Sequence, residues 1–179
     1  MMAEINLDYL NECFTWDYDG NLTWKERPRS HFTSDGDYKR FFTRFVNKPA
    51  GYIDRSGYYA VGLCRKTRAA HRILYMLYHN TIIPDGLEVD HEDENKLNNT
   101  FKNLRLATNG QNKCNISKRK DNTTGYKGVS FDKYRKKFES RIRFGGKKEF
   151  LGRFDTAEDA YEAYKAASVK YHGEFSNFG

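Results

Sequence analysis

A charged and polar stretch, ISKRKDNTT at residues 116–124, is the feature that most limits how this chain can fold. It separates two longer segments that are rich in apolar and aromatic side chains, so one continuous core is not expected. With 179 residues, the chain is long enough for one medium domain or two small ones. We therefore predict a first domain over residues 1–115, a linker over 116–124 and a second domain over 125–179.

The composition supports two small, aromatic-rich cores. Hydrophobic residues make up 38% of the chain and include 13 Tyr, 13 Phe and 2 Trp, which argues against a disordered protein. The three cysteines, Cys13, Cys64 and Cys114, form no CxxC pair. We therefore expect reduced thiols rather than a zinc knuckle or a disulfide framework.

Neither a membrane span nor a targeting segment is expected. No apolar run reaches the roughly 18 residues that a membrane-spanning helix requires. Residues 1–10 contain Glu4 and Asp8 and lack the basic-then-apolar pattern of a signal peptide. These features predict a soluble, cytoplasmic protein with no membrane partner.

Basic residues are concentrated in one part of the chain. The net charge is +7, yet residues 1–112 balance 15 basic against 15 acidic side chains. Residues 113–153 carry 14 basic and 4 acidic residues, whereas residues 154–179 carry 2 basic and 5 acidic ones. A concentrated basic segment is typical of a protein that binds a polyanion, although a solvated basic surface is the simpler alternative. The segment has the pattern of strands, which argues against a basic amphipathic helix on an anionic membrane.

Apolar periodicity and turn residues predict an α+β first domain. Residues 14–24 have the pattern of a strand, a turn and a strand, and residues 50–64 that of a hairpin. Residues 25–47 are polar and basic and contain Pro28 and Gly36, so an irregular loop is expected there. The other expected elements are helices over 5–14, 69–79 and 109–115, the last capped by Thr108 or Asn109, and strands over 87–91 and 104–108.

The second domain is expected to be a three-stranded sheet packed on one helix. The strands fall over residues 126–131, 136–144 and 147–152, and Gly145-Gly146 suits a two-residue hairpin turn. The helix covers 156–172, because Thr156 and Asp159 form a capping pair and Gly173 follows the last turn.

The candidate catalytic residues lie around the expected strand at 87–91. Hydrolysis of a phosphodiester requires a base that activates water and a cation near the scissile phosphate. His91 suits the base, because a histidine titrates near neutral pH. The carboxylate of Asp90 and the amide oxygen of Asn112 suit a hard cation such as Mg²⁺. Adjacent strand residues point to opposite faces, so a bend at the strand end is needed to bring both to one phosphate.

This part of the chain resembles the HNH endonucleases, particularly the homing type encoded by phages and introns. The match consists of HRILYMLYH at 71–79, LEVDH at 87–91, NN at 98–99, NLR at 103–105 and QN at 111–112. The resemblance implies a ββα-metal (His-Me finger) core over about residues 69–115 and an Mg²⁺- or Mn²⁺-dependent nuclease.

The resemblance also implies roles for individual residues. His91 would be the general base, and Asn103 would brace the loop and orient His91. Asp90 and Asn112 would be the cation ligands. Asn112 stands where many family members have His, which favours a magnesium-type over a zinc-type site. For the His71-Arg72 pair, a structural or phosphate-contacting role is implied.

Each of these residues also has a plain structural interpretation. Asp90 and His91 can be ordinary loop-capping residues, and Asn103 can make an Asx-turn. Asn112 is one of several asparagines in its neighbourhood. The acidic run at 92–94 can bind a cation but more simply forms a solvated turn.

The strand at 136–144 predicts a basic sheet face. Its apolar positions alternate with Lys137, Glu139, Arg141 and Arg143, so one face meets the helix and the other carries charge. A sheet with basic side chains on its open face can enter the major groove of DNA. The alternative is a charged face that binds nothing.

The second domain resembles the Apetala-type (ethylene-response-factor) DNA-binding domain. The match consists of GYKGVSF at 125–131, LGRFDTAEDAYEAY at 151–164 and YHGEFSNF at 171–178. By position, the resemblance implies DNA contacts at Lys127, Ser130, Arg141, Arg143, Lys148 and Phe150. Arg135, near the first turn, is expected to contact phosphate.

The sequence thus predicts a metal-dependent HNH DNA endonuclease, of the phage homing or free-standing type, that a C-terminal domain targets to DNA. The expected partner is double-stranded DNA in the cytoplasm of a host cell, without a small-molecule cofactor. The choice between monomer and dimer stays open. The main alternative is a non-catalytic DNA-binding regulator with a decayed nuclease half, and another is an RNA nuclease or RNA-binding protein.

Overall fold

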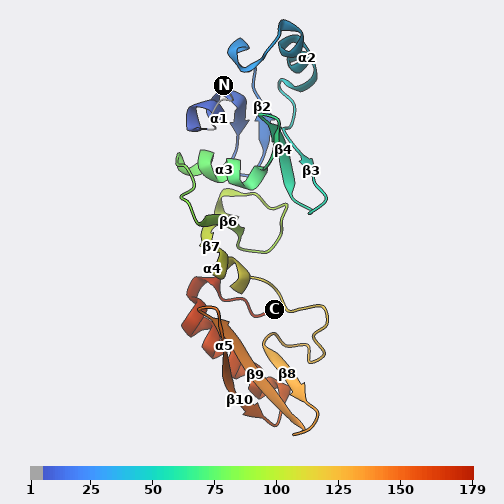
Figure 1. The fold of residues 1–179 in the computed structure, drawn as a ribbon, viewed down its shortest axis with the longest axis vertical. Coiled ribbons are helices and arrows are strands. Elements are labelled where there is room, and N and C mark those ends of the chain that lie inside the picture. The colour runs from blue at the N-terminus through green and yellow to red at the C-terminus, as the bar shows by residue number, and fades with distance from the viewer. Residues whose placement is uncertain (1–5) are drawn as a thin grey trace. The chain divides into compact units, whose positions relative to one another are not determined.

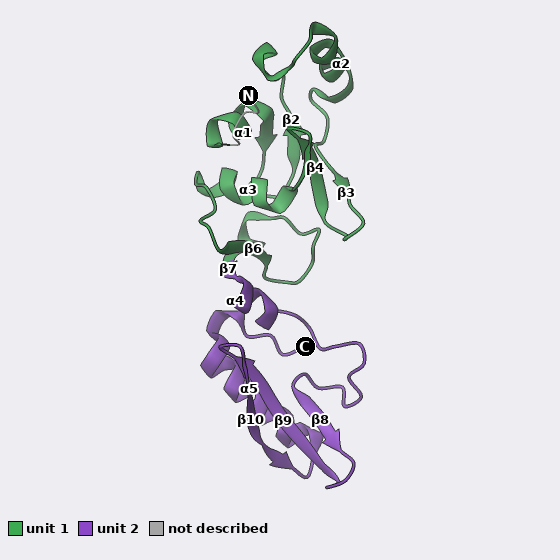
Figure 2. Ribbon diagram, in the orientation of Figure 1, with its two compact units in different colours: residues 1–106 green, residues 107–179 purple. Residues whose placement is uncertain are grey.

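The computed structural model describes residues 6–179, and its elements divide between two units, residues 1–106 and 107–179 (Figure 2). Ile5, at the start of the first expected helix, lies outside the described residues. The boundary precedes the helix at Asn109–Cys114, so this helix and the stretch at 116–124 both belong to the second unit. Among the described residues, no helix is long and apolar enough to cross a membrane.

The first unit is a mixture of short helices and small sheets (Figure 1). Its elements are α1 (Leu7–Cys13), β1 (Phe14–Trp16), β2 (Leu22–Trp24), α2 (Asp35–Phe45), β3 (Tyr52–Ile53), β4 (Tyr59–Leu63), β5 (Lys66–Ala69), α3 (Ala70–His79) and β6 (Leu87–His91), with 3-10 turns at Arg29–His31 and Phe101–Asn103. β1 pairs antiparallel with β2, and β3, β4 and β5 form an antiparallel sheet. β6 forms a two-stranded sheet with β7 (Leu104–Thr108).

α3 lies at the centre of the first unit's core because seven of its ten residues are buried. The apolar side chains of Ile73, Leu74 and Leu77 pack with residues of α1, β1, β2 and β4 in one cluster. α3 ends at Asn80, whose left-handed conformation suits asparagine. The face of α3 that carries His71 and Tyr78 contacts His91 and Asn99.

The prediction of an irregular loop over residues 25–47 is wrong, because it contains α2. Ser34 caps the helix by accepting a hydrogen bond from the Asp37 N–H, and Asp35 and Asp37 stand in its first turn. No residue of α2 is fully buried, but Tyr38, Phe41, Phe42 and Phe45 fall at helical spacing and form an apolar stripe. Its Phe41 packs on Trp24 and on the guanidinium of Arg27.

The second unit is the expected antiparallel sheet with a helix packed on it. Its strands, β8 (Val129–Asp132), β9 (Lys137–Phe144) and β10 (Lys147–Phe154), are arranged in the order β10-β9-β8. The helix α5 (Ala157–His172) begins at Thr156 and buries Ala160, Tyr164 and Ala167. Together with Ile142 these side chains make the small core. β8 begins three residues later than expected, because residues 126–128 form a turn.

Candidate active site

Asp90 and His91 occupy the last two positions of β6, and each is only 6% exposed. The chain bends directly after His91, where the Glu94 N–H donates to the His91 carbonyl oxygen at 3.1 Å. Glu94 has a φ of +61°, which marks this tight turn. A bend was expected at this point of the chain. The side chain of Asp90 bonds to Arg105 on β7, and that of His91 bonds to Asn99 in the loop after β6.

The carboxylate of Asp90 is paired with Arg105 on β7. The Arg105 Nε–H donates to Asp90 Oδ2 at 3.1 Å, and the two side chains are 17% and 7% exposed. A buried carboxylate requires such a partner, since an uncompensated charge is costly to remove from water. The pair fixes the orientation of the Asp90 carboxylate.

The imidazole of His91 is held by the side chain of Asn99. His91 Nε2 lies 2.9 Å from Asn99 Oδ1, and both groups are buried. Because the amide oxygen can only accept, Nε2 carries the proton and donates it. In the neutral ring the lone pair is then on Nδ1, which is the nitrogen that can take a proton from water.

Asn99 is itself fixed by its surroundings. It is 3% exposed, and its carbonyl oxygen accepts a hydrogen bond from the Tyr78 hydroxyl of α3 at 2.9 Å. Gly20 packs against its backbone so closely that a Cβ there would lie 2.8 Å from the Asn99 carbonyl carbon. With a φ of +94°, position 20 strongly favours glycine.

Asn103 braces the loop between β6 and β7. Its Oδ1 accepts from the Asp93 N–H at 3.0 Å, and its Nδ2 donates to Asp93 Oδ1 at 2.8 Å and to the Asn98 carbonyl at 2.7 Å. Asn103 makes these hydrogen bonds to the loop, as expected of a residue that braces it, whereas Asn99 contacts the His91 ring. The NN pair at 98–99 was part of the sequence match, but nothing in the pattern assigned Asn99 this contact.

His71 and Tyr58 flank the His91 ring. The ring centroids of His71 and His91 are 4.9 Å apart in an edge-on arrangement, and those of Tyr58 and His91 are 6.0 Å apart. The Nδ1 atom of His71 is buried without a hydrogen-bond partner. Burial, together with the neighbouring His91 and Arg72, lowers the pKa of His71 to about 3. His71 is therefore a neutral wall of the site, which fits the structural role implied for it.

The donor set near His91 suits a hard cation better than a zinc ion. Within residues 6–179, no group of three or more His, Cys, Asp or Glu side chains is placed to hold a metal. Asp93 is committed to the loop: burial raises its pKa, but hydrogen bonds from Asn98, Asn95 and Asn103 outweigh this and lower it. Asp90 therefore remains the acidic ligand candidate, and its oxygens leave most positions of an Mg²⁺ shell to water and phosphate.

Asn112 lies on α4 (Asn109–Cys114), which is built into the second unit. Thr108, one of the two N-caps that the sequence predicted, caps α4 and forms a capping box with Gln111.

The Lys127 ammonium donates to the carbonyl oxygens of Cys114 and Asn177, each at 3.0 Å. Two backbone carbonyls thus bind the Lys127 ammonium.

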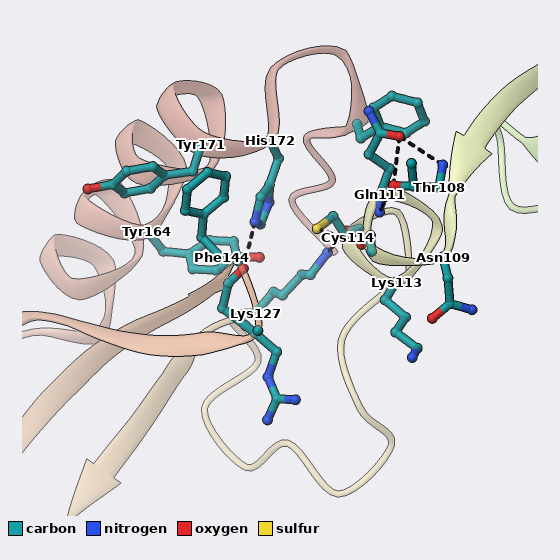
Figure 3. Close-up of a pocket in the computed structure, with 15 residues that line it drawn as sticks. Thr108, Asn109, Gln111, Lys113, Cys114, Lys127, Phe144, Tyr164, Tyr171 and His172 are labelled. Atoms are coloured by element: carbon teal, nitrogen blue, oxygen red, sulfur yellow. Dashed lines mark hydrogen bonds between the residues drawn. The ribbon is translucent and has the colours of Figure 1, made fainter. Parts of the chain in front are cut away.

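A cavity of about 560 Å³ lies within the second unit beside α4, and in Figure 3 the Lys127 side chain extends through it toward Cys114. Phe144 and Tyr171 stack with ring centroids 5.0 Å apart, and with Tyr164 they form its aromatic side. His172 closes this side by a 2.9 Å hydrogen bond from Nε2 to the Arg143 carbonyl oxygen. The cavity therefore belongs to the packing that supports α4.

The other predicted DNA contacts lie on or beside the sheet face that is not covered by α5. The side chains of Arg141, Arg143 and Lys148 are exposed, and Phe150 is 47% exposed. Ser130 is exposed on the edge strand β8. Arg135 lies in the β8–β9 turn and forms a 3.0 Å ion pair with Asp132.

Two residues of this face were given no role from the sequence: Glu139, which was placed on the charged face, and Arg153, which was not. Glu139 accepts hydrogen bonds from Arg141 at 2.7 Å and from Arg153 at 2.8 Å. Both guanidinium groups also approach the Phe150 ring, with centroid distances of 5.6 and 5.1 Å. Glu139 thus holds two arginines around one exposed aromatic ring.

Comparisons with known proteins point to one family. The profile of the HNH endonuclease family matches residues 68–114. The chain is 36% identical over 134 residues to the uncharacterized HNH endonuclease L560 of Acanthamoeba polyphaga mimivirus. The matched residues are 73% of this chain and 67% of that protein. It is 35% identical over 99 residues to Protein 3.8 of Escherichia phage T7, covering 55% of this chain and 81% of that protein. No solved structure matches the chain.

Proposed function

The chain belongs to the HNH endonuclease family and is a nuclease, and from that premise we propose that it hydrolyses phosphodiester bonds of double-stranded DNA with one divalent cation, Mg²⁺ or Mn²⁺. The observation that carries the proposal is the buried Asp90-His91 pair, each member fixed by its own partner. Preorganised groups of this kind are what hydrolysis of a phosphodiester requires.

His91 acts as the general base in this proposal. Because Nε2 donates to Asn99, Nδ1 accepts the proton of the attacking water. Asn99 and the flanking rings of His71 and Tyr58 keep the imidazole in one orientation. Asn103 acts one step further away, by holding the loop that presents Asn99.

Asp90 would hold the cation, and the resemblance to the family implies the amide oxygen of Asn112 as a further ligand. When bound, the cation supplies positive charge beside the scissile phosphate and the leaving oxygen. Arg105 orients the Asp90 carboxylate through Oδ2 and balances its charge. One carboxylate and one amide suffice for a single ion whose remaining ligands are water and phosphate.

A titration of plasmid nicking with Mg²⁺ tests this assignment. Asp90→Asn retains the size of the side chain but removes its charge, so half-maximal nicking should require at least about tenfold more Mg²⁺. Glu88→Gln is the matched control, because Glu88 lies on the same strand two residues away. Equal Mg²⁺ requirements for wild type and Asp90→Asn would remove Asp90 from the ligand set.

Replacement of Asn99 tests the orientation of the base. Asn99→Leu removes the acceptor for His91 Nε2, so single-turnover nicking should slow by about 10- to 100-fold. Asn99→Asp retains an acceptor oxygen and should recover most of the rate. Nitrogen NMR shifts of the His91 ring should show Nε2 protonated in wild type and a mixture of tautomers in Asn99→Leu. If both variants lose the rate equally and the shifts do not change, Asn99 only supports the fold.

We propose that the second unit is an Apetala-type DNA-binding domain that targets the nuclease. The antiparallel sheet, the single covering helix and the cationic open face support this assignment. The preorganised Glu139, Arg141 and Arg153 group supplies donors of the kind that contact base edges in a major groove. Both relatives are viral, which supports a phage-type homing or free-standing endonuclease that acts in the host cell.

A further inference from the structure

A second concave surface lies within the second unit, next to the open sheet face. It has a volume of about 440 Å³, and we call it the cationic groove. Its lining side chains include six basic ones and one acidic one, Asp121. The lining residues are Lys113, Ile116, Ser117, Lys118, Arg119, Asp121, Asn122, Lys127, Gly128, Val129, Ser130, Arg141 and Lys148.

One wall of the groove is the stretch at 116–124, which the sequence analysis interpreted as a linker. Hydrogen bonds anchor its C-terminal end: Asn122 Nδ2 donates to the Tyr126 carbonyl at 2.7 Å. Asn122 Oδ1 accepts from the N–H groups of Thr124 and Gly125 at 3.0 and 2.8 Å. The Thr124 hydroxyl donates to the Val129 carbonyl at 3.1 Å, which ties the stretch to β8. These contacts tie the C-terminal end of the stretch to the start of β8.

The acidic residue of the groove does not cancel its charge. Asp121 pairs with Arg119 at 2.9 and 3.0 Å, and the two side chains are 69% and 86% exposed. Exposed pairs of this kind contribute little stability. The Arg119 guanidinium can therefore exchange the carboxylate for a phosphate at little cost, in the same bidentate geometry.

The groove is continuous with the proposed DNA-reading face. Arg141 and Lys148 line the groove and also belong to the open face of the sheet. Ser130 adds a hydroxyl donor from β8. Gly128 also lines the groove, and a Cβ at this position would lie 2.0 Å from the Tyr164 ring. A strand of DNA that leaves the sheet face therefore meets positive charge along the groove.

We propose that the cationic groove binds the sugar–phosphate backbone of duplex DNA without regard to sequence. This inference rests on the proposed function, since it assigns DNA as the polyanion. Cationic side chains that bind the phosphates of DNA release condensed counterions from it. They therefore supply affinity and salt dependence but no base discrimination. The groove thus acts as an affinity element beside the reading face.

The test measures binding to a random-sequence DNA duplex in EDTA over a range of salt concentrations. Lys118→Gln/Arg119→Gln removes two charges from the groove. The slope of log affinity against log salt should become shallower by about 1 for each cation removed, and affinity near physiological salt should fall about tenfold. The matched control is Lys170→Gln/Lys165→Gln on α5, which contributes no residue to the groove. Circular dichroism and urea unfolding confirm that the variants are folded.

The proposal is overturned by wild-type affinity and slope in the groove variant, or by an equal loss in the α5 control. It is also overturned if the loss on a selected, preferred site exceeds that on random DNA, or if wild type binds duplex RNA as tightly as duplex DNA. Because EDTA removes the cation, the result does not depend on cleavage. A protein that binds as expected but never cuts would contradict the proposed function and leave the groove assignment standing.

Discussion

Replacing His91 by alanine should slow DNA cleavage by about 100- to 10,000-fold while DNA binding persists, because a positioned general base contributes a factor of that size. The imidazole is fixed by Asn99 and by the rings of His71 and Tyr58, so its loss removes a preorganised group. The basic residues assigned to DNA binding lie in the second unit, whereas His91 lies in the first, so the substitution leaves them unchanged.

The measurement is single-turnover nicking of supercoiled plasmid, with binding measured separately in EDTA. His79→Ala is the matched control, since His79 is exposed at the end of α3. Wild-type cleavage by His91→Ala would remove His91 from the mechanism. A parallel loss of cleavage and binding would show that the substitution disturbs the fold instead of the chemistry.

His71 should make the protein less stable as the pH falls from about 6.5 toward 3. Its pKa is about 3 in the folded chain and lies near the ordinary value of 6.5 in the unfolded chain. Between these values the unfolded chain binds the extra proton, so acid favours unfolding. The stability that the neutral ring contributes is fully present above pH 6.5, and about 3–5 kcal/mol of it is lost across the window.

Urea unfolding at pH 7 and pH 4.5 tests this expectation with His71→Phe. The substitution retains a ring but removes the titrating group and the unpartnered Nδ1. The variant should match or exceed wild-type stability at pH 7 and gain about 2–3 kcal/mol over wild type at pH 4.5. His79→Phe controls for the exposed histidine on the same helix. An equal pH dependence in wild type and His71→Phe would contradict a depressed pKa for His71.

The second unit was predicted well because its local signals agree. Thr156 and Gly173 bound α5 as expected, and its small and aromatic residues fall at helical spacing. The turn at Gly145 and Gly146 needs positive φ at both positions, and the two values are +57° and +77°. Each of these signals depends on neighbouring residues, so no long-range information was needed.

The helix α2 was missed although it carries the pattern of an amphipathic helix. Tyr38, Phe41, Phe42 and Phe45 fall at helical spacing, but the polar and basic composition, Pro28 and Gly36 favoured a loop. Phe41 packs against the core and on the guanidinium of Arg27, which also lies over the rings of Tyr9 and Trp24. A second signal was local: Ser34 followed by Asp35 and Asp37.

The candidate site shows the same division between local and long-range information. The ordered motif gave Asp90, His91 and Asn103, but the partner of His91 depends on how the loop after β6 folds back. Arg153 was missed for a geometric reason. A register shift between Phe150 and Gly152 places Arg153 opposite Glu139, on the face that simple alternation assigned to Lys148 and Phe150.

The most direct test of the central claim is nicking of supercoiled plasmid by purified wild type and His91→Ala, each with Mg²⁺, Mn²⁺ or EDTA. We expect wild type to convert supercoiled into open-circular DNA with either cation and not in EDTA, and His91→Ala to nick the plasmid at least about 100-fold more slowly. Cleavage that persists in EDTA would contradict the cation requirement. Tight DNA binding without cleavage of any plasmid or genomic DNA would favour a DNA-binding regulator over the proposed nuclease.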